Sequence, residues 1–542
     1  MEISGQLVDL HQRSLYPAKI RIEGRTILSV ERVEHAEKRY IMPGFTDAHI
    51  HIESSMVTPA MFARSAIRHG TVAAVADPHE IANVLGREGV EFMVGNAATV
   101  PLKYMFGAPS SVPATNFETS GASIGVNDVA LLLDMPGVGL LSEVMNYPGV
   151  LGNDPELIGK IGEALKRDVP VDGHAPGLTG DDLLRYVSAG ITTDHECVTI
   201  DEAREKIAAG MKILIREGSA AKNLEALHPL LKESPDSVML CSDDLHPYDL
   251  QRGHINLMVK RLLQRGYDLF DVLRAASLNP VLHYNLPVGL LRQGDRADFI
   301  IVDDIGEIRV SETYIEGEAV CSGGETLFTI PGCQARNNFN CSPILSEEIA
   351  VEGAGTVRVI AASDGSLVTG ELTARPPVAD GRVLIDVEND ILKIVVKDRY
   401  RDAPPVVAFI NGFGLKRGAF ASSVAHDSHN IVAVGADDMA LKEAVNAVIE
   451  MKGGIAWADP GNSILTLQLE IGGIMSSKDL DTLSTEYEMI NNAIKAAGST
   501  LTEPCMTLSF MALLVIPELK IGDRGLFDVR RFGYVPLFTD ND

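Results

Sequence analysis

The chain begins with short runs in which apolar and polar residues alternate. Ile20 and Ile22, for example, are separated by one polar residue shortly before a Glu-Gly-Arg turn. A period of two is typical of a half-buried β-strand. Similar β-type sequence returns at residues 290–302, and an N-terminal β-meander on its own would lack a partner face. We therefore expect residues 1–41 and 287–340 to form one small composite β-sandwich domain.

The pattern changes at residue 42 and stays regular to about residue 286. Short apolar runs alternate there with helical patterns. The runs end near His51, Asp77, Gly107, Glu143, His174, His195, Arg216 and Asp243. Eight strands alternating with helices over about 240 residues have the count and size of a (β/α)8 barrel. Residues 42–286 are therefore predicted to be such a barrel, although no eightfold sequence repeat supports it.

The helices of this region are predicted from apolar residues that recur at helical spacing. The helical patterns lie at residues 59–69, 181–189, 201–209, 250–264 and 270–276. Thr179, with Asp182 three residues on, resembles the start of a capping box. The barrel prediction is weakest at residues 108–123, a stretch rich in Pro, Ser and Thr that separates the third strand from the fourth.

Residues 345–542 are predicted to form a separate α+β domain. Strand-like runs at 391–396, 406–410 and 431–434 are followed by helical patterns at 438–451 and 479–497. The expected fold class is thus α/β, a (β/α)8 TIM-type barrel with a small composite β-sandwich domain and an α+β C-terminal domain.

Composition narrows the choice of partners. The 542 residues carry a formal net charge of −27, which argues against a nucleic-acid backbone or an anionic membrane as the main partner. The six cysteines include no C-x-x-C pair, as expected of thiols in a reducing compartment. The sequence has no signal-peptide pattern and no apolar run of the roughly 18 residues that a membrane span needs. We expect a soluble, cytoplasmic protein.

The candidate chemistry begins at the end of the first barrel strand. Asp47, His49 and His51 alternate there, so an extended strand turns all three side chains to one face. Two imidazoles on one face can bind a divalent metal, although an isolated H-x-H is as often a pair of solvated histidines. Because barrel enzymes carry their catalytic groups at the carboxyl ends of the strands, the other strand ends decide between these interpretations.

The strand ends carry a consistent set of ligand-type residues. The set comprises His49, His51, Glu143, His174, His195 and Asp243. Four histidines and two carboxylates suit two divalent metals bridged by a carboxylate and a hydroxide. Any one of these residues alone is more often structural than a ligand, but six at matching strand ends are hard to obtain by chance.

Three other motifs were weighed against this site. His51-Ile-Glu53 matches the H-x-E of single-zinc deaminases by letters, but Cys505 lacks the second cysteine that such a site needs. The glycines at 412, 414 and 418 have the wrong spacing for a dinucleotide loop. The sequence leaves open whether His426 and His429 form a surface turn, a structural cluster or a lid that reaches the active site.

The same residues resemble a known family. The chain resembles the amidohydrolase superfamily in its H-x-H, the histidines after strands five and six, the Asp after strand eight, Asn279-Pro280 and Gly294-Asp-Arg-Ala-Asp-Phe. Within it, the chain resembles the adenine deaminases, because Glu143 stands where many members have a carboxylated lysine. Further matches are His51-Ile-Glu-Ser-Ser-Met, Ala76-Asp-Pro-His-Glu-Ile-Ala-Asn-Val, Arg216-Glu-Gly-Ser-Ala-Ala, Ser242-Asp-Asp-Leu-His-Pro, Ala425-His-Asp-Ser-His-Asn and Ile516-Pro-Glu-Leu-Lys.

The resemblance implies hydrolysis of adenine to hypoxanthine and ammonia, in purine salvage, by a metal-bound hydroxide that attacks C6. Asp243 is then a candidate to take the hydroxide proton, Glu80 to serve ring nitrogen N1, and His79 to orient the hydroxide. Asp77, Asp244 and Arg216 are candidate substrate-binding residues. The structural alternative for Glu80 is a carboxylate favoured by a helix N-terminus, and for Asp244 a partner of a ligand histidine.

The resemblance also implies two divalent metal ions as cofactors. Manganese is expected, with iron or zinc as alternatives, because a histidine and carboxylate set accepts all three. A homo-oligomer is expected on the frequency of such assemblies alone.

Two further functions stay open at this point. Loop variation on a barrel allows a different amidohydrolase reaction, on a cyclic amide or another aminopurine. A non-catalytic protein on a hydrolase scaffold is less consistent with a full ligand set.

Overall fold

A computed structural model describes residues 1–219, 221–462 and 464–539 of the chain. Ala220 of the predicted 216–221 motif and the last three residues of the predicted C-terminal domain lie outside the described part. The chain divides into two compact units. The first unit comprises residues 1–79, 90–111 and 124–333, and the second comprises residues 80–89, 112–123 and 334–542. The domain boundaries predicted at residues 41, 286 and 345 stay predictions.

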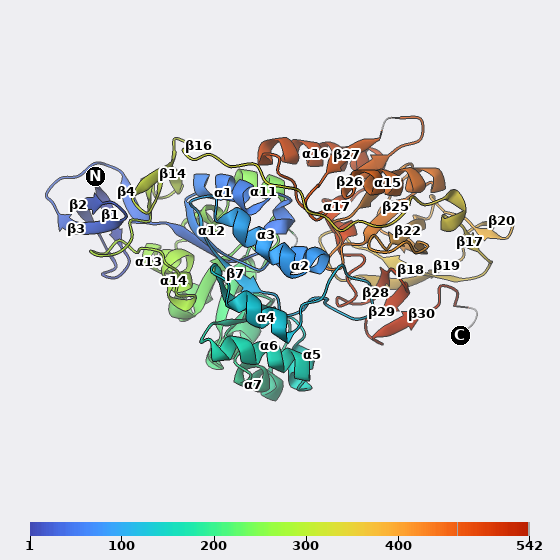
Figure 1. The fold of residues 1–542 in the computed structure, drawn as a ribbon, viewed down its shortest axis with the longest axis horizontal. Coiled ribbons are helices and arrows are strands. Elements are labelled where there is room, and N and C mark those ends of the chain that lie inside the picture. The colour runs from blue at the N-terminus through green and yellow to red at the C-terminus, as the bar shows by residue number, and fades with distance from the viewer. Residues whose placement is uncertain (220, 463, 540–542) are drawn as a thin grey trace. The chain divides into compact units, whose positions relative to one another are not determined.

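In the first unit, the N-terminal strands share one sheet with strands that follow the barrel (Figure 1). The sheet order is β16 (Glu325–Thr326), β15 (Glu318–Ser322), β14 (Arg309–Ile315), β13 (Phe299–Asp304), β4 (Tyr40–Pro43), β1 (Glu2–Asp9), β2 (Ser14–Glu23) and β3 (Thr26–Arg32). The two parts meet where Ile300 pairs with Met42. Ile20, Ile27 and Phe299 are fully buried in the same apolar cluster. The apolar side chains of the N-terminal strands therefore pack against apolar side chains of the later segment.

The barrel of the first unit is built from eight strands in chain order. They are β5 (Phe45–Ile50), β6 (Thr71–Ala76), β7 (Lys103–Ala108), β8 (Val138–Val144), β9 (Val171–Gly173), β10 (Thr193–Asp194), β11 (Lys212–Arg216) and β12 (Val238–Cys241). β5 to β9 form one parallel sheet and β10 to β12 another. The Thr192 N–H donates to the Val171 carbonyl at 2.9 Å, which links the two sheets.

The barrel closes between its first and last strands. A parallel bridge joins Ile50 to Asp243, and the Asp243 N–H donates to the His49 carbonyl at 3.0 Å. Every residue of β5 and β6 is buried, as expected of parallel strands covered on both faces. The predicted barrel is confirmed, and each strand ends within two residues of its predicted end.

The helices around the barrel follow the sequence pattern with three differences. The predicted helix 250–264 is wrong as one element, because the chain forms α11 (Pro247–Arg252) and α12 (Ile255–Gln264) with a break at Gly253 and His254. The His254 side chain, at this break, contacts Asp47 and Thr71. The predicted helix 270–276 is α13 (Leu269–Leu273), which continues through a π-helical turn into α14 (Asn279–His283).

The third difference concerns helix α7 (Gly180–Ser188). Thr179 is its N-cap residue, but the Thr179 side chain makes no capping hydrogen bond. The helices α1 (Pro59–Arg68) and α8 (Ile200–Ala208) begin and end within one residue of their predicted bounds. The remaining helices of this part of the chain are α2 (His79–Leu85), α3 (Arg87–Ala97), α4 (Val126–Leu133), α5 (Tyr147–Leu151), α6 (Pro155–Lys166), α9 (Leu224–Leu227) and α10 (Leu230–Glu233).

Two segments that follow barrel strands belong by their contacts to the second unit. These are residues 80–89 and 112–123, and they hold each other, since the Gly121 N–H donates to the Asn83 carbonyl at 2.8 Å. Asn430, from the C-terminal half, donates to the Thr119 carbonyl at 2.9 Å. The Pro-, Ser- and Thr-rich stretch that weakened the barrel prediction is thus a long excursion of the chain into the second unit.

The second unit is centred on an eight-stranded sheet, which confirms the predicted α+β character. Its order is β19 (Gly370–Ala374), β18 (Val357–Ala361), β23 (Val406–Asn411), β22 (Leu392–Lys397), β25 (Ile431–Gly435), β24 (Ala419–Ser422), β26 (Gly454–Ala458) and β27 (Leu465–Gln468). Helix α15 (Asp438–Met451) packs on β24, β25 and β26 (Figure 1), and its apolar face buries Leu441, Val445 and Val448. Helix α16 (Leu480–Ala496), helix α17 (Pro504–Ser509) and the strands β28 (Leu519–Gly522), β29 (Gly525–Asp528) and β30 (Gly533–Val535) complete the unit.

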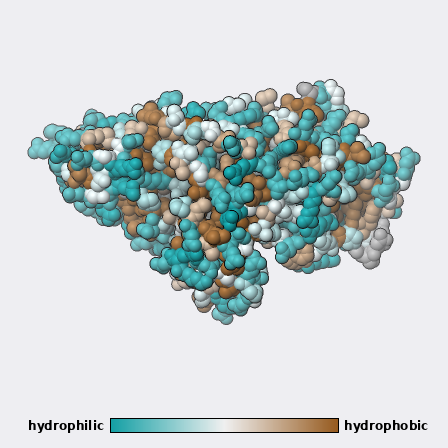
Figure 2. Space-filling view, viewed as in Figure 1, coloured by the Kyte–Doolittle hydropathy of each residue, from teal (hydrophilic) through white to brown (hydrophobic). Residues whose placement is uncertain are grey.

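Hydrophilic side chains cover most of the molecular face in view (Figure 2), in keeping with the net charge of −27. Across the described ranges, the structure contains no helix that is both long and apolar enough to cross a membrane.

Candidate metal centre

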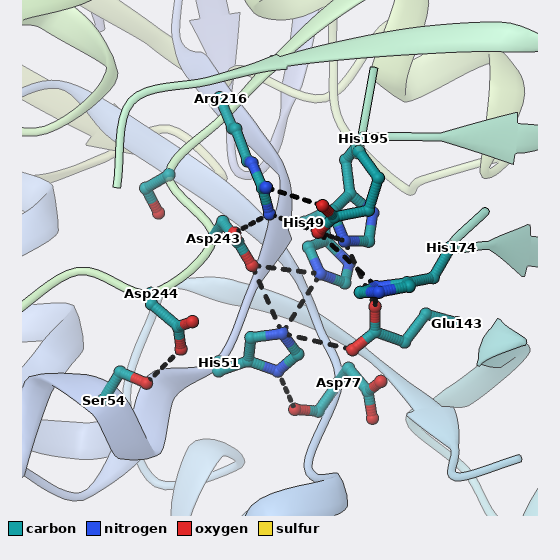
Figure 3. Close-up of polar contacts among 12 residues, drawn as sticks. His49, His51, Ser54, Asp77, Glu143, His174, His195, Arg216, Asp243 and Asp244 are labelled. Carbon is teal, nitrogen blue, oxygen red and sulfur yellow. Dashed lines mark hydrogen bonds and ion pairs between the residues drawn. The ribbon is translucent and has the colours of Figure 1, made fainter. Parts of the chain in front are cut away.

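The strand ends of the barrel bring all six predicted ligand residues together (Figure 3). The Nε2 atoms of His49 and His51 are 3.3 Å apart. The His49 ring stacks on the His195 ring with centroids 4.2 Å apart, and His174 meets His195 edge-on. Five of the six residues are buried, and His174 is half-buried. The convergence predicted from β-strand spacing is therefore present.

Glu143, at the end of β8, faces two groups of histidines at once. Its Oε1 lies 3.4 Å from His51 Nε2. Its Oε2 lies 2.7 Å from His174 Nδ1 and 3.1 Å from His195 Nε2. Each oxygen of this one carboxylate thus addresses a different set of imidazoles, which is how a carboxylate that bridges two cations must be placed.

The two oxygens of Asp243, just after β12, also face different partners. Its Oδ1 lies 3.3 Å from His51 Nε2 and 3.6 Å from His49 Nε2. Its Oδ2 accepts a hydrogen bond of 2.5 Å from Arg216 Nη1. The Arg216 guanidinium also binds both oxygens of Glu196, at 2.5 and 2.8 Å. Arg216 therefore fixes one oxygen of Asp243 and leaves the other directed at the histidines.

Asp47 holds the first and last strands in register beneath this cluster. Its carboxylate accepts hydrogen bonds from the backbone N–H groups of His49 (3.3 Å) and Ser242 (3.0 Å). It also pairs with His254 Nε2 at 2.8 Å, while His254 Nδ1 lies 2.7 Å from the Thr71 hydroxyl. The two ring nitrogens of His254 thus contact Asp47 on one side and Thr71 on the other. Asp47 thereby orients the backbone on both sides of the candidate ligands.

Charges and hydrogen bonds within the cluster shift the pKa values of its members. Burial disfavours ionised Glu143, but the charge of His174 and hydrogen bonds from His174 and His195 hold the pKa of that carboxyl well below its usual range. Burial likewise opposes ionised Asp243, yet Arg216 and the hydrogen-bonded His49 and His51 hold its pKa well below the usual range. Burial would lower the pKa of His174, but Glu196 and Glu143 raise it to about 9. Both carboxylates are therefore anionic at neutral pH.

This donor set fits divalent cations. In each of four groups at the strand ends, one nitrogen or carboxylate oxygen of each residue lies within 4.8 Å of those of the other members. The groups are His49 with His195 and Asp243, Glu143 with His174 and His195, His51 with Asp77, His79 and Glu143, and His51 with Asp243 and Asp244. Neutral imidazole and carboxylate are the ligands preferred by Zn, Fe and Mn, and concentrated buried anions are stabilised by cations. The residues present are compatible with two metal ions.

The residues predicted to bind substrate lie against the same cluster. The Asp77 carbonyl lies 3.2 Å from His51 Nδ1, and its Oδ2 lies 3.3 Å from His79 Nδ1. Asp244 accepts a hydrogen bond of 2.5 Å from the Ser54 hydroxyl. The contacts of Arg216 are with Asp243 and Glu196, as described above. These contacts place Asp77, Asp244 and Arg216 at the centre, and their substrate-binding role stays a prediction.

Glu80, the predicted proton-transfer group, belongs to the second unit. It is buried, and its two carboxylate oxygens contact Nδ1 of His426 and Nε2 of His429. The sequence left the surroundings of these two histidines open. The structure places them in a buried cluster, which excludes the surface turn.

Sequence reasoning missed Glu196 and His254. Glu196 lies just after β10, at the carboxyl end of a barrel strand where such enzymes carry their functional groups, and this position was a signal for it. His254 gave no such signal, because it lies inside what reads as a helix and meets Asp47 only through the fold.

Comparison with known proteins agrees with this geometry. The model of the amidohydrolase family matches residues 40–320, and the model of the adenine deaminase C-terminal domain matches residues 366–533. Adenine deaminase of Salinibacter ruber is 52% identical over 541 residues, which cover 99% of each chain. Adenine deaminases of Methanosarcina mazei and Borreliella burgdorferi are 49% and 45% identical, and the alignments cover 98–99% of this chain and 99% of theirs. The chain therefore belongs to the amidohydrolase family and, within it, to the adenine deaminases.

Proposed function

We propose that this protein hydrolyses adenine to hypoxanthine and ammonia at a centre for two divalent metal ions. The single observation that carries the proposal is Glu143, whose two oxygens face separate sets of histidines. A glutamate at this place is also what the sequence resemblance to adenine deaminases rests on. Adenine gains one water and loses one ammonia, so the reaction needs a nucleophile at C6 and proton transfers to N1 and to the leaving amine.

The residues that would hold the two ions are His49, His51, Glu143, His174, His195 and Asp243, and the two oxygens of Glu143 face different members of this set. When bound, two such cations lower the pKa of a shared water into the neutral range and so provide the nucleophile. We favour manganese, with iron and zinc as alternatives, because the donor set accepts all three.

Asp243 is proposed to receive the proton of the attacking water. Arg216 fixes its Oδ2 at 2.5 Å, which keeps the carboxylate ionised and leaves Oδ1 directed at the histidines. Glu196 in turn accepts hydrogen bonds from Nη1 and Nη2 of Arg216. This chain of contacts supports a positioning role for Arg216 in addition to its predicted contact with substrate.

His79 and Glu80 are proposed to act on the purine ring and the leaving group. His79 stands beside Asp77, His51 and Glu143, where an imidazole can orient the water that attacks C6. Glu80 follows it directly in the chain and is proposed to deliver a proton to N1. Asp244, held by Ser54, is proposed to accept a hydrogen bond from an N–H of the purine edge.

The wider setting follows from the reaction and the sequence. We propose that the reaction serves purine salvage and that the protein acts in the cytoplasm. We propose a homo-oligomer on the frequency of symmetric assemblies among enzymes.

The test measures ammonia release by purified protein loaded with manganese, iron or zinc. Adenine should be turned over, whereas guanine, adenosine, cytosine and dihydropyrimidines should be poor substrates. No ammonia from adenine with both metals present would refute the proposal. Preferred hydrolysis of a dihydropyrimidine would identify a cyclic-amide hydrolase instead.

A further inference from the structure

The second unit contains a carboxylate held between two histidines of one short turn. Glu80 Oε1 contacts His426 Nδ1, and Glu80 Oε2 lies 2.5 Å from His429 Nε2. All three side chains are more than nine-tenths buried. One nitrogen meets each oxygen, so the carboxylate cannot rotate about its last bond without losing both contacts.

The turn that carries the histidines connects β24 to β25 and is fixed within the second unit. The His426 ring stacks on Phe510 with centroids 4.6 Å apart, and the His426 N–H donates to the Ser509 carbonyl at 3.0 Å. The Tyr400 hydroxyl donates to the Ser428 carbonyl at 2.7 Å. These contacts restrain the imidazole of His426 before Glu80 is considered.

The tautomer of His429 follows from its second nitrogen. The Ala425 N–H donates to His429 Nδ1 at 3.2 Å, so Nδ1 is an acceptor and carries no proton. His429 Nε2 therefore carries the N–H that donates to Glu80. The backbone N–H of Ala425 thus determines which nitrogen of His429 carries the proton.

The geometry points to His426 and His429 as positioning residues that hold the Glu80 carboxylate in the orientation needed for proton transfer to the substrate. This inference rests on the proposed function of Glu80. Catalytic groups lose efficiency when they depart from productive geometry by about 0.5 Å or 10–20°. The C-terminal half would then contribute to the rate of the reaction through Glu80, beyond any role in stability.

A purely structural cluster predicts a different response to substitution, because it depends on packing and not on which nitrogen is present. Asparagine places an amide N–H the same number of bonds from Cα as Nδ1 of histidine, and glutamine does so for Nε2. His426→Asn and His429→Gln therefore keep an N–H near the place of the ring nitrogen that contacts Glu80. The exchanged variants, His426→Gln and His429→Asn, make similar changes in size but misplace the donor.

The experiment compares these four variants of the full-length, metal-loaded protein. We expect His426→Asn and His429→Gln to lower kcat less than about tenfold, and the exchanged variants to lower it about 100-fold. KM for adenine should change less than about threefold, because residues that act only through Glu80 would leave substrate binding unchanged. Metal content by elemental analysis and the thermal unfolding midpoint should be similar within each pair.

A second comparison uses the background of Glu80→Gln. If the histidines act through Glu80, the exchanged variants should reduce kcat no further in that background. Equal kcat for preserving and exchanged variants, or an undiminished effect in the Glu80→Gln background, would overturn the inference while leaving the proposed function intact. Absence of adenine turnover by the wild-type protein would instead overturn the proposed function and, with it, this inference.

Discussion

The barrel and the second unit each contain a buried cluster of histidines and carboxylates, but the two clusters are built differently. In the barrel, four of the contacts that Glu143 and Asp243 make with His49, His51 and His195 are 3.1–3.6 Å long, although Glu143 Oε2 also lies 2.7 Å from His174 Nδ1. In the second unit, both oxygens of Glu80 form short, direct contacts with His426 and His429. Groups that stand apart around a common point can share a cation, whereas groups already in contact satisfy each other. The two clusters therefore differ at Glu143 Oε1 and Asp243 Oδ1, which lie 3.3–3.6 Å from the histidines that they face, whereas both oxygens of Glu80 are in direct contact.

The largest expected effect comes from removing the metal ions. Dialysis against a chelator should abolish ammonia release from adenine, since metal catalysis contributes several kcal/mol and each 1.36 kcal/mol is tenfold, giving a loss of at least about 10³-fold. Manganese, iron or zinc added back should restore it. If protein with less than about one ion per chain were fully active, the barrel cluster would not be a metal site needed for activity, and the two clusters would no longer differ in this way.

The metal-free protein should also bind protons where the ions would lie. Because Glu196 and Glu143 raise the pKa of His174 to about 9, this imidazole is protonated at neutral pH before metal binds. Metal binding must displace that proton, so apparent affinity should increase from about pH 6 to pH 9. Isothermal titration in buffers of different ionisation enthalpy measures the protons released, and zero release at pH 7 would contradict this expectation.

Glu143→Gln should have the next largest effect. The amide keeps the size of the side chain but loses one anionic oxygen, so the two histidine sets no longer share a bridging carboxylate. We expect bound metal to fall by about one ion per chain and kcat/KM to fall about 10³-fold. Glu450→Gln, at an exposed position at the end of α15, is the matched control and should leave both quantities unchanged. A fully metallated, active Glu143→Gln protein would show that the bridge is not needed.

Asp47→Asn should have a smaller effect, because Asp47 orients the centre without belonging to it. An amide cannot accept from His254, Ser242 and His49 as the carboxylate does. Loss of such a supporting partner costs about 10–100-fold in metal affinity or activity. Competition with a fluorescent chelator measures the affinity. His254→Gln should give a similar loss, and the double variant should be less than additive.

The smallest expected effect lies in the second unit and concerns stability. Burial lowers the pKa of Lys520 from its usual 10.5 to about 7, and its ammonium faces only the carbonyls of Leu367 and Phe510 among the described residues. Between about pH 7 and 10.5 the unfolded chain binds a proton that the folded chain does not, so stability should rise with pH across this window.

Lys520→Met should remove this dependence and stabilise the protein near pH 7 by on the order of a few kcal/mol. Urea unfolding of the metal-loaded protein at pH 7 and pH 9 gives the comparison. The exposed Lys38, changed to Met, should leave the slope as in the wild type. If the free energy of unfolding of Lys520→Met increased with pH as steeply as that of the wild type, other groups would be the cause of the pH dependence.

The sequence predicted the barrel and its six candidate ligands because both depend on the spacing of residues within short segments of the chain. His49 and His51 share a face by the period of a strand, and Glu143, His174, His195 and Asp243 lie at strand ends that a barrel gathers at one rim. Buried parallel strands also consist of apolar runs, so the predicted strand ends lie within two residues of the observed ends.

What the sequence could not give are contacts between residues far apart in the chain. His426 and His429 meet Glu80 across 346 and 349 positions, and His254 meets Asp47 across 207. No periodicity encodes such pairs. The break of the predicted helix at Gly253 has the same origin, because the tertiary contacts of His254 override a continuous helical pattern.

The closure of the barrel has a consequence for how the chain unfolds. The seam lies between the first and last strands, where His49 and Asp243 share a backbone hydrogen bond, and the side chains of the same two residues are candidate ligands. A cation bound by both would cross-link the ends of a loop of nearly two hundred residues, and such links lower the entropy of the disordered chain most when the loop is long. The bound cation would then also hold the barrel closed, and amide hydrogen exchange along β5 and β12 should be the first to accelerate when the cation is removed.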